Sequence, residues 1–552
     1  MSAVQTQPAV SDREHDAILD AVARPGLDFM PDSDGNRIIV SDPLAGRHLR
    51  MSASAARLLQ ALDGTRTPAD IAAHLGITDP AMVDQALARF RDLQLTTTAA
   101  EAAQAEPPKA PRRWRYRPPG VLELALLNPV RLLAACAPLG RAAASRAGQL
   151  LVGAVTVGGL GYYALTGSAA TDELARPTSL PVVLGMLLLM ITTTFVHEIG
   201  HGLSLVRGGG RVHRLGVMLM YGSPAMFCDV SEAWRLPRGK RLLVALAGIR
   251  VHLAAAGLAG AIAPNLPPGG WRQLLAGLLV SNLLMAVINL CPFVKFDGYV
   301  ALIGWLDRPH LRATAMADAQ RTAAVLVFGG RLDQRPRLRR VLFGTACAIT
   351  APVLVTTAFL SYQTFVLVVL GPIGATLVLA ALGWVGYLLL RKLAQWHRLA
   401  KESGAGPVRR LAGGLVLAAV LAGALTGIRL PHSVSSVYAT TPQGLAMVLP
   451  ADTDAAVLAG RQVDLQASGV VLHPKTAEAT VCGASTTRSL PVEAGSPVAV
   501  PVTARASRTV VPLCVRTPPS RTDGLTTVRL DDITLASWLF HTFAAPAWAQ
   551  LF

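Results

Sequence analysis

Apolar runs and short clusters of basic residues alternate along the middle of the chain. A membrane-spanning helix needs about 20 predominantly apolar residues, and seven runs come near that length. They lie at residues 148–167, 180–206, 241–263, 273–293, 341–360, 364–390 and 411–430. This pattern predicts a polytopic α-helical membrane protein whose membrane domain covers residues 148–430.

The pattern differs on both sides of the membrane domain. Residues 1–23 are polar and are expected to be disordered, whereas residues 24–95 show two short strand patterns followed by three helical ones. That order predicts a winged-helix-like α+β domain. Residues 96–147 join a linker rich in proline and arginine to an interrupted apolar stretch, which we expect to form a helix at the membrane interface. Residues 431–552 contain short strand-like runs, which predict a mostly β domain.

Composition and charge support this class and exclude another. Hydrophobic residues make up 52% of the chain and charged residues only 15%, as expected for a membrane protein. The net charge of +17 raises the question of nucleic-acid binding. The basic residues, however, cluster beside apolar runs as cytoplasmic loops do, so we expect no nucleic-acid partner. The alternation of basic and uncharged loops predicts a multi-pass plasma-membrane protein with its N-terminus in the cytoplasm and its C-terminus outside.

The six cysteines include no CxxC pair, and only Cys482 and Cys514 share a polar region. Thiols are free to pair in the oxidising space outside the cell. We therefore expect a Cys482–Cys514 disulfide in an extracytoplasmic β domain. The alternative is two buried thiols.

The second apolar run carries three ionisable residues in the stretch HEIGH, residues 197–201. Ionisable groups inside a membrane span are costly and rarely lack a function. His197 and His201 are four residues apart and share one face of a helix, and Glu198 lies one step round it. In this HExxH pattern two imidazoles bind Zn²⁺ and the glutamate acts as general base. The alternative is a pair of core histidines satisfied by hydrogen bonds.

A zinc hydrolase also needs a third protein ligand and an open position for water. The candidate is Asp297, in the stretch NLCPFVKFDGY at the end of the fourth apolar run. Pro292 breaks the helix before it, and Gly298 permits a tight turn after it. The third apolar run holds a further charged pair, Arg250 and His252. Either these two residues line a polar cavity, or that span begins later.

The HEIGH stretch and the later Asp297–Gly298 pair together resemble the site-2 protease family of intramembrane zinc metalloproteases. Asn289, eight residues before Asp297, stands where that family typically has an asparagine. The resemblance covers roughly residues 180–305 and implies one Zn²⁺ per chain, bound by His197, His201 and Asp297. It further implies that Glu198 is the general base and that Asn289 steadies the substrate backbone or the developing oxyanion.

The stretch HRLGVMLMYGSPAMFCDV, residues 213–230, is apolar and β-prone. In the site-2 protease family this region is a membrane-associated hairpin whose edge pairs with the substrate. The alternative is ordinary loop packing. The wider form NLCPFVKFDGY looks most like the branch that matures ribosomally made peptides, such as those of daptide clusters. Relatives often carry a proline and an asparagine where Ile249 and His252 stand, so the resemblance assigns no substrate contact in the third run.

Residues 24–95 resemble the PqqD-like recognition element of ribosomal-peptide biosynthesis. The resemblance rests on GRHLRMS, on LLQALDGTRTPADIAAHLG and on a final helix ending in LQL. Such elements bind the leader of a precursor peptide as an added strand. The resemblance implies a leader-binding groove formed by the strand His48, Leu49, Arg50 and Met51 and by Val83 and Leu87 of the last helix. The alternative is a winged helix that binds DNA or packs on its own chain.

The parts together predict an intramembrane zinc metalloendopeptidase that binds a ribosomally synthesised precursor peptide by its leader and cleaves it during maturation or export. Its expected partners are that peptide, the lipid bilayer, and other maturation enzymes or an exporter. One rival function is a regulatory site-2 protease that cleaves a membrane-anchored signalling protein. Another is a non-catalytic chaperone or exporter with a structural metal, but such a site has no need of the base Glu198.

Overall fold

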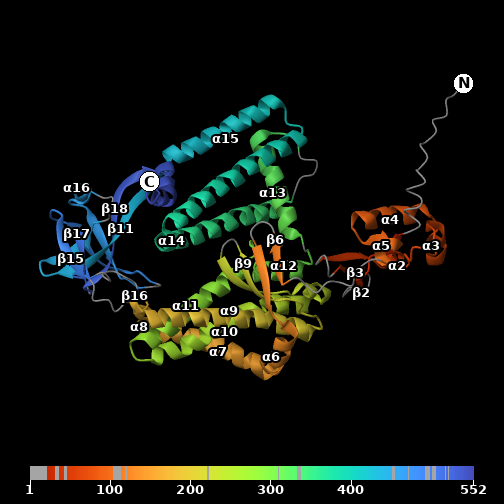
Figure 1. Ribbon diagram of the computed structural model, residues 1–552, viewed down its shortest axis with the longest axis horizontal. Coiled ribbons are helices and arrows are strands. Elements are labelled where there is room, and N and C mark those ends of the chain that lie inside the picture. The colour runs from red at the N-terminus through yellow and green to blue at the C-terminus, as the bar shows by residue number, and fades with distance from the viewer. Residues whose placement is uncertain are drawn as a thin grey trace. The chain divides into compact units, whose positions relative to one another are not determined.

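The computed structural model describes residues 21–31, 37–42, 47–103, 113–117, 121–220, 223–308, 310–331, 337–449, 454–469, 472–491, 498–499, 505–515, 518–519 and 521–551 (Figure 1). The chain forms two compact units, one of Met1–Ala142 with His197–Gly248 and one of Ala143–Val196 with Ile249–Phe552. The division falls inside α9 (Leu180–Gly208) and α10 (Arg238–Ile262), so each of these helices belongs to both units.

The N-terminal part contains a three-stranded antiparallel sheet followed by three helices. The sheet has the order β2 (Asp28–Pro31), β3 (Arg37–Asp42), β4 (Arg47–Ser52), so β4 is one of its edges. The helices are α2 (Ala53–Gln60), α3 (Pro68–Leu75) and α4 (Ala81–Asp92). The strand pair and the three helices lie where the sequence predicts them, and β2 is an addition that the sequence pattern did not indicate.

Local chemistry sets the ends of α3. The Thr67 hydroxyl accepts a hydrogen bond from the Asp70 backbone N–H, and the Asp70 carboxylate accepts one from the Thr67 backbone N–H. This capping box satisfies two donors that the first turn leaves without a helical partner. Gly76 ends the helix in the left-handed region, at φ 67°, where glycine meets no Cβ penalty.

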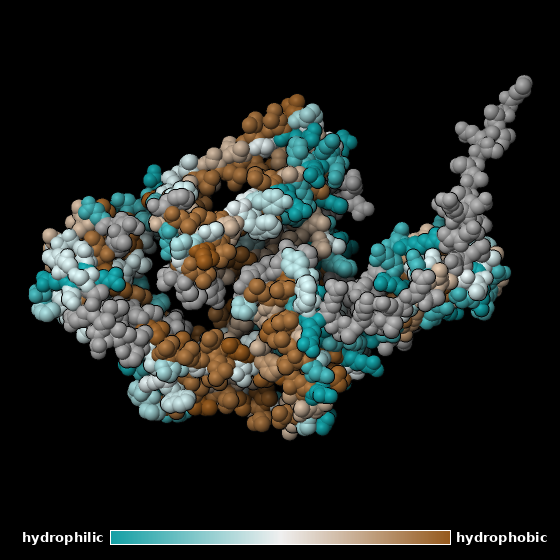
Figure 2. Space-filling model, viewed as in Figure 1, coloured by the Kyte–Doolittle hydropathy of each residue, from teal (hydrophilic) through white to brown (hydrophobic). Residues whose placement is uncertain are grey.

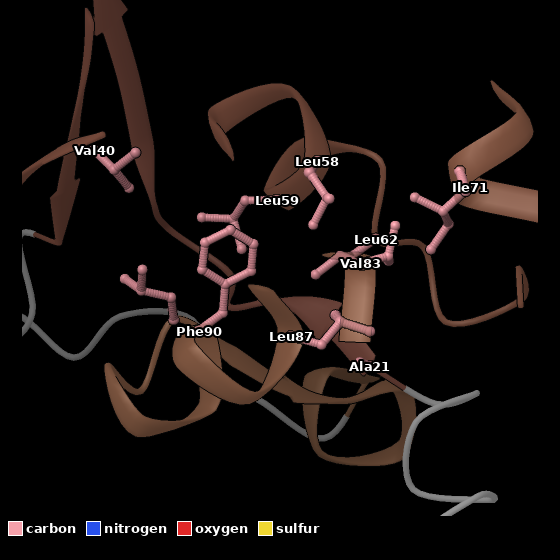
Figure 3. Packing of buried hydrophobic residues seen from close by; sticks show 11 residues of the cluster. Ala21, Val40, Leu58, Leu59, Leu62, Ile71, Val83, Leu87 and Phe90 are labelled. Atoms are coloured by element: carbon pink, nitrogen blue, oxygen red, sulfur yellow. The ribbon is translucent and has the colours of Figure 1, made fainter. Parts of the chain in front are cut away.

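The expected leader groove is wrong in one respect. Val83 and Leu87 of α4 are 0% and 2% exposed, and they point into the domain's own core with Leu59 and Phe90 (Figure 3). The apolar stripe of α4 is therefore the face that holds the domain together. A periodic stripe has the same appearance in sequence whether it faces a core or a ligand, which is why the pattern did not separate the two.

Two expected boundaries also change. Residues 1–20 lie outside the described part, but Ala21–Ala23, expected to be disordered, form β1, which pairs with β5 (Thr96–Thr98). Within the expected interfacial helix, residues 121–127 instead form β7 (Val121–Leu127), and only the following α6 (Pro129–Ala144) is helical. Glu123 of β7 explains the difference, because its buried carboxylate forms an ion pair with Arg214, next to β9 (Leu215–Met220).

Within the described residues, seven helical segments are long and apolar enough to cross a membrane, which is compatible with a multi-pass membrane protein. They are Arg146–Thr166 (α7), Leu180–Gly208 (α9), Arg238–Asn265 (α10 and the turn after it), Gly270–Leu290 (α11), Leu338–Leu360 and Leu370–Glu402 (both in α14, Leu338–Glu402), and Pro407–Gly427 (α15). Each overlaps one of the seven predicted runs. Figure 2 shows apolar side chains gathered over these helices, as a lipid-facing surface requires.

The C-terminal part folds into a β-barrel. Seven antiparallel strands follow the order β12-β11-β18-β13-β14-β17-β15, and β12 also pairs with β17, which closes the barrel. The strands are β11 (Arg429–Thr441), β12 (Gly444–Val448), β13 (Gln462–Gln466), β14 (Lys475–Val481), β15 (Thr486–Pro491), β17 (Arg505–Val515) and β18 (Asp523–Thr534). Closure pairs β12, β11, β18, β13, β14 and β17 in a ring and so leaves few edges that invite pairing with other chains, whereas β15 pairs with β17 alone among the described strands.

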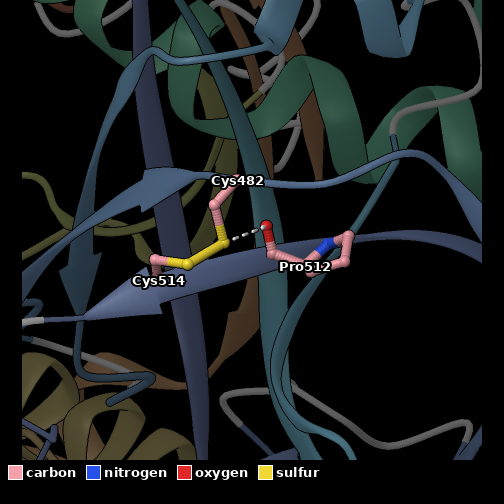
Figure 4. Close-up of a disulfide and its surroundings, with 3 residues drawn as sticks. All are labelled: Cys482, Pro512 and Cys514. Carbon is pink, nitrogen blue, oxygen red and sulfur yellow. Dashed lines mark hydrogen bonds between the residues drawn. A yellow bond between two sulfur atoms is a disulfide. The ribbon is translucent and has the colours of Figure 1, made fainter.

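A disulfide joins Cys482, which directly follows β14, to Cys514 of β17 (Figure 4). The two strands it connects are already neighbours in the barrel, with Val481 opposite Leu513. The crosslink therefore fastens the barrel where two adjacent strands meet.

The disulfide leads to a measurable expectation for the purified protein. Peptide mapping without reduction is expected to recover Cys482 linked to Cys514. Replacing both by serine should lower the stability of the barrel by about 3–4 kcal/mol on the chain-entropy estimate, because the bond joins residues 32 positions apart. Cys136→Ser, at a free and half-buried thiol, is the control and should change little. Recovery of both cysteines as alkylated thiols without reduction would contradict the pairing.

Candidate metal centre

Two histidines of the HEIGH stretch lie together on α9. His197 and His201 are 4% and 5% exposed, and their Nε2 atoms are 3.1 Å apart. Their rings meet edge to face, with centroids 4.7 Å apart. Helical spacing of four residues produces this proximity. Two imidazole nitrogens that face each other at this distance can supply two of the ligands of a metal site.

The neighbouring helix α10 fixes both rings. The Nδ1–H of His201 donates a hydrogen bond to the Val244 carbonyl oxygen at 2.7 Å, and this bond makes Nε2 the unprotonated nitrogen of the neutral ring. Ligand histidines commonly have such a partner, which sets their tautomer and orientation. One turn further along α10, a Cβ at Gly248 would overlap the ring of His197. The glycine therefore allows the helix backbone to lie directly against the imidazole.

Asp297 completes the group. The ligand atoms of His197, His201 and Asp297 all lie within 4.8 Å of one another. Asp297 is the first residue of α12 (Asp297–Leu306), and a Cβ at the following Gly298 would collide with the Leu290 carbonyl. Two imidazoles and one carboxylate can hold a metal ion, and three protein ligands leave a position open, as in catalytic rather than structural zinc sites. The donor set thus fits the predicted cofactor.

Glu198 lies beside this group without belonging to it. Its side chain is 14% exposed, and Oε1 is 4.0 Å from Nε2 of His197. A carboxylate at this distance is close enough to reach a ligand in the open position and is not itself one of the three groups that could hold a metal. This is the arrangement that a general base next to a metal site requires.

The side chain of Asn289 forms a hydrogen bond within its own helix. It lies near the end of α11, half-buried, and its side-chain amide donates a hydrogen bond to the Met285 carbonyl of the same helix at 3.0 Å. This bond accounts for one of the amide's groups and leaves the carbonyl oxygen of the side chain for another role. The expected contact with substrate stays a prediction.

The predicted hairpin is present and belongs to a larger sheet. β9 pairs with β10 (Ser223–Cys228), β9 also pairs with β7, and β7 with β6 (Trp114–Arg117), in the order β10-β9-β7-β6. β10 is therefore an edge strand, and residues 221–222 of the hairpin lie outside the described part. A Cβ at Gly202, the residue after His201, would lie 3.3 Å from the Cys228 sulfur. The edge strand thus ends beside the turn of α9 that carries a ligand histidine.

Cys228 lies close to the site and is not part of the grouped set of His197, His201 and Asp297. Burial, followed by the negative charges of Glu198 and Asp229, raises the pKa of the Cys228 thiol. A metal ligand must be a thiolate. In the absence of a metal the thiol stays protonated and packs as a small apolar group.

The connection between α9 and β9 is held by Glu232 in the short helix η1 (Ser231–Arg235). Its carboxylate accepts hydrogen bonds from the Arg211 backbone N–H and from Nε2 of His213, both at 2.8 Å. Burial alone would raise the pKa of Glu232, but these bonds and the nearby Arg235 charge hold it below its usual value. His213 thus has a structural partner, and the hairpin starts from a fixed point.

Val244 and Gly248 were not predicted from the sequence. Val244 acts through its backbone carbonyl, which every residue has, so its identity carries no signal. Gly248 occupies the stretch LAGIR of an apolar run, where a small residue is common for packing reasons alone. Its position along the helix is the only sequence feature that could have indicated its role, because no motif links Gly248 to His197.

Of the predicted leader-binding residues, His48, Leu49, Arg50 and Met51 all lie in β4, the edge strand. Leu49 and Met51 pack partly against the domain's core. β4 is an end strand of the sheet, so its backbone lies along the sheet's edge. Val83 and Leu87 lie in the core, as described above, and drop out of the candidate site.

The close approach at Gly248 generates a direct test. Gly248→Ala should weaken metal binding by about tenfold or more, because the new methyl group needs the space of the His197 ring and displaces a ligand. The affinity for zinc can be measured by competition with a chromogenic chelator. Gly239→Ala on the same helix, where a Cβ would meet nothing within 4 Å, is the matched control. Equal affinities of the two variants would show that the ring's position is not critical.

No protein-family model, curated protein or solved structure matches this chain. Among the described residues, the grouping of His197, His201 and Asp297 is the feature that bears most directly on function.

Proposed function

We propose that this protein is an intramembrane zinc endopeptidase that cleaves a precursor peptide recognised by its leader. The single observation that carries the proposal is the grouping of His197, His201 and Asp297 within 4.8 Å, with Glu198 alongside. These residues come from apolar helices, where ionisable groups need a functional reason. A non-catalytic chaperone would need no base at this place.

The chemistry follows from the roles of the chain's own residues. Zinc, when bound, lowers the pKa of water toward neutrality and polarises a carbonyl. Glu198 accepts a proton from the attacking water and returns it to the leaving amine. The Val244 carbonyl holds His201 in the tautomer whose Nε2 can bind metal. Asn289 is the candidate for holding the substrate backbone, through the side-chain oxygen that its intrahelical bond leaves available.

Substrate presentation rests on the edge strand β10. A protease acts on an extended backbone, and a free strand edge holds such a backbone by hydrogen bonds that do not depend on side chains. β10 has its unpaired edge in the four-stranded sheet, and its end at Cys228 lies next to Gly202. A peptide added along β10 would be led toward the turn of α9 that carries His201.

Recognition is assigned to the N-terminal domain. The residues His48–Met51 form the open edge β4 of its sheet, which suits a leader peptide added as a further strand. Because recognition and cleavage lie on one chain, a bound leader raises the local concentration of the attached cleavage site. The correction of Val83 and Leu87 means that specificity comes from side chains other than these two.

The proposed orientation places the N-terminal domain in the cytoplasm and the β-barrel outside the plasma membrane. The basic clusters of the predicted cytoplasmic loops support it. The Cys482–Cys514 disulfide supports it independently, since such bonds persist in oxidising compartments. Precursor would then be bound on the side where it is made and cut before or during export.

Glu198→Gln is expected to keep the metal and lose cleavage. The change preserves shape and removes the base, so turnover of a leader-bearing precursor peptide should fall about 10²-fold or more. Glu173→Gln, at another buried glutamate, which bonds to Arg176, is the control and should cleave normally. Product masses provide the measurement. Near-normal turnover by the Glu198 variant would mean that another group activates the water.

The recognition step can be tested on the peptide, with the protein unchanged. Leader peptides with N-methyl groups at alternate amides should bind the full-length protein about tenfold or more weakly in one register, because each lost backbone bond costs about 1 kcal/mol. Methylation shifted by one residue affects outward-facing amides and should leave binding intact, which makes it the matched control. Binding can be followed by fluorescence anisotropy. If both registers or a scrambled leader bind equally, the added-strand mode is wrong and the regulatory protease becomes the better proposal.

A further inference from the structure

A second pair of polar residues is buried among the apolar helices, apart from the metal group. His252 of α10 and Asn282 of α11 are both 0% exposed. The Nδ1–H of His252 donates to the side-chain oxygen of Asn282 at 2.7 Å. The Asn282 amide donates in turn to the Leu278 carbonyl at 2.9 Å and contacts the Met190 sulfur of α9 at 3.6 Å. The pair thus connects three helices.

Stability alone gives a weak reason for this pair. Interhelical hydrogen bonds between side chains in apolar bundles contribute little net stability on average. Burying an imidazole and an amide costs free energy that the bonds must first offset. Two leucines of similar volume would hold the helices together at least as well. What buried polar pairs add in the best-attested cases is register, since displaced helices leave the polar groups without partners.

The position of His252 on α10 shows which contacts depend on where this helix lies along its neighbours. Residues 244, 248 and 252 are spaced by four and form one stripe along the helix. Val244 supplies the carbonyl that orients His201, and Gly248 lies against the ring of His197. His252 continues the stripe by one turn. A rotation or a slide of α10 that breaks the His252 bond would move both contacts of the ligand histidines.

The contact of the pair with α9 leads to the same conclusion. Met190 precedes His197 by seven residues, which is about two helical turns, so both side chains lie on the same side of α9. The Asn282 amide meets Met190. The polar pair therefore contacts the same face of α9 that carries the first ligand histidine.

We propose that His252 and Asn282 are positioning residues that hold α10 in the register in which Val244 and Gly248 fix the two ligand histidines. The proposal rests on the proposed metal function and adds two residues that set metal affinity from outside the ligand set. Neither residue is assigned contact with metal or substrate. The physical claim is that the pair fixes where α10 lies along α9.

α11 supplies a matched control. Gln273 is 6% exposed, and its amide donates to the Glu173 and Pro177 carbonyls at 3.1 and 3.3 Å. It is buried on the same helix and bonded to the connection before α9, with no bond to α10. Gln273→Leu thus removes a comparable polar group without touching the stripe of residues 244, 248 and 252.

The experiment measures zinc affinity by chelator competition, together with the thermal midpoint, for the full-length protein in detergent. His252→Leu and Asn282→Leu are each expected to weaken zinc binding about tenfold or more, as loss of outer-sphere support does. The double variant should be no weaker than the worse single one, because both changes break one interaction. Gln273→Leu should keep its zinc affinity within about twofold of the unchanged protein, whatever its thermal midpoint.

A conservative variant guards against simple misfolding. His252→Gln retains a side-chain donor for Asn282 and should recover most of the zinc affinity lost in His252→Leu. The proposal is overturned if the leucine variants bind zinc as tightly as the unchanged protein. It is equally overturned if Gln273→Leu loses as much affinity, or if glutamine fails to recover any. An unchanged protein that binds no zinc would instead remove the metal function on which the proposal rests.

Discussion

The structure depends on one constraint, which is that ionisable groups in apolar helices must be satisfied by each other, by the backbone or by a metal. α9 places two imidazoles with their Nε2 atoms 3.1 Å apart, and the third group, Asp297, brings a negative charge to them. A cation bound between them turns three costly groups into a favourable cluster. The same constraint explains why His252 and Asn282 occur as a bonded pair.

Backbone plays as large a part as side chains in meeting this constraint. The Val244 carbonyl fixes one ligand ring, and the missing Cβ of Gly248 makes room for the other. The strand edges β10 and β4 offer backbone groups to peptides. If the proposed function holds, the protein recognises its substrate twice by strand addition, once at the leader and once near the cleavage site. Both steps would then tolerate variation in the sequence of the peptide.

The sequence predicted the features that rest on composition or on strict spacing. The seven apolar segments follow from length and hydropathy, and the grouping of His197, His201 and Asp297 was anticipated from HExxH and a later Asp-Gly pair. It did not predict that residues 121–127 form a strand, because the decisive partner, Arg214, lies about ninety residues away. Val83 and Leu87 were misplaced for a related reason. Periodicity gives the apolar face of a helix but not what covers that face.

X-ray absorption at the zinc edge can establish whether two imidazoles and one carboxylate bind zinc in this protein. The account predicts one zinc per chain with only nitrogen and oxygen neighbours at about 2.0–2.1 Å, an imidazole signature from two histidines, and loss of tight binding in Asp297→Ala. A sulfur neighbour at about 2.3 Å would place a cysteine such as Cys228 at the metal. That result, or undiminished zinc in the Asp297 variant, would contradict the account.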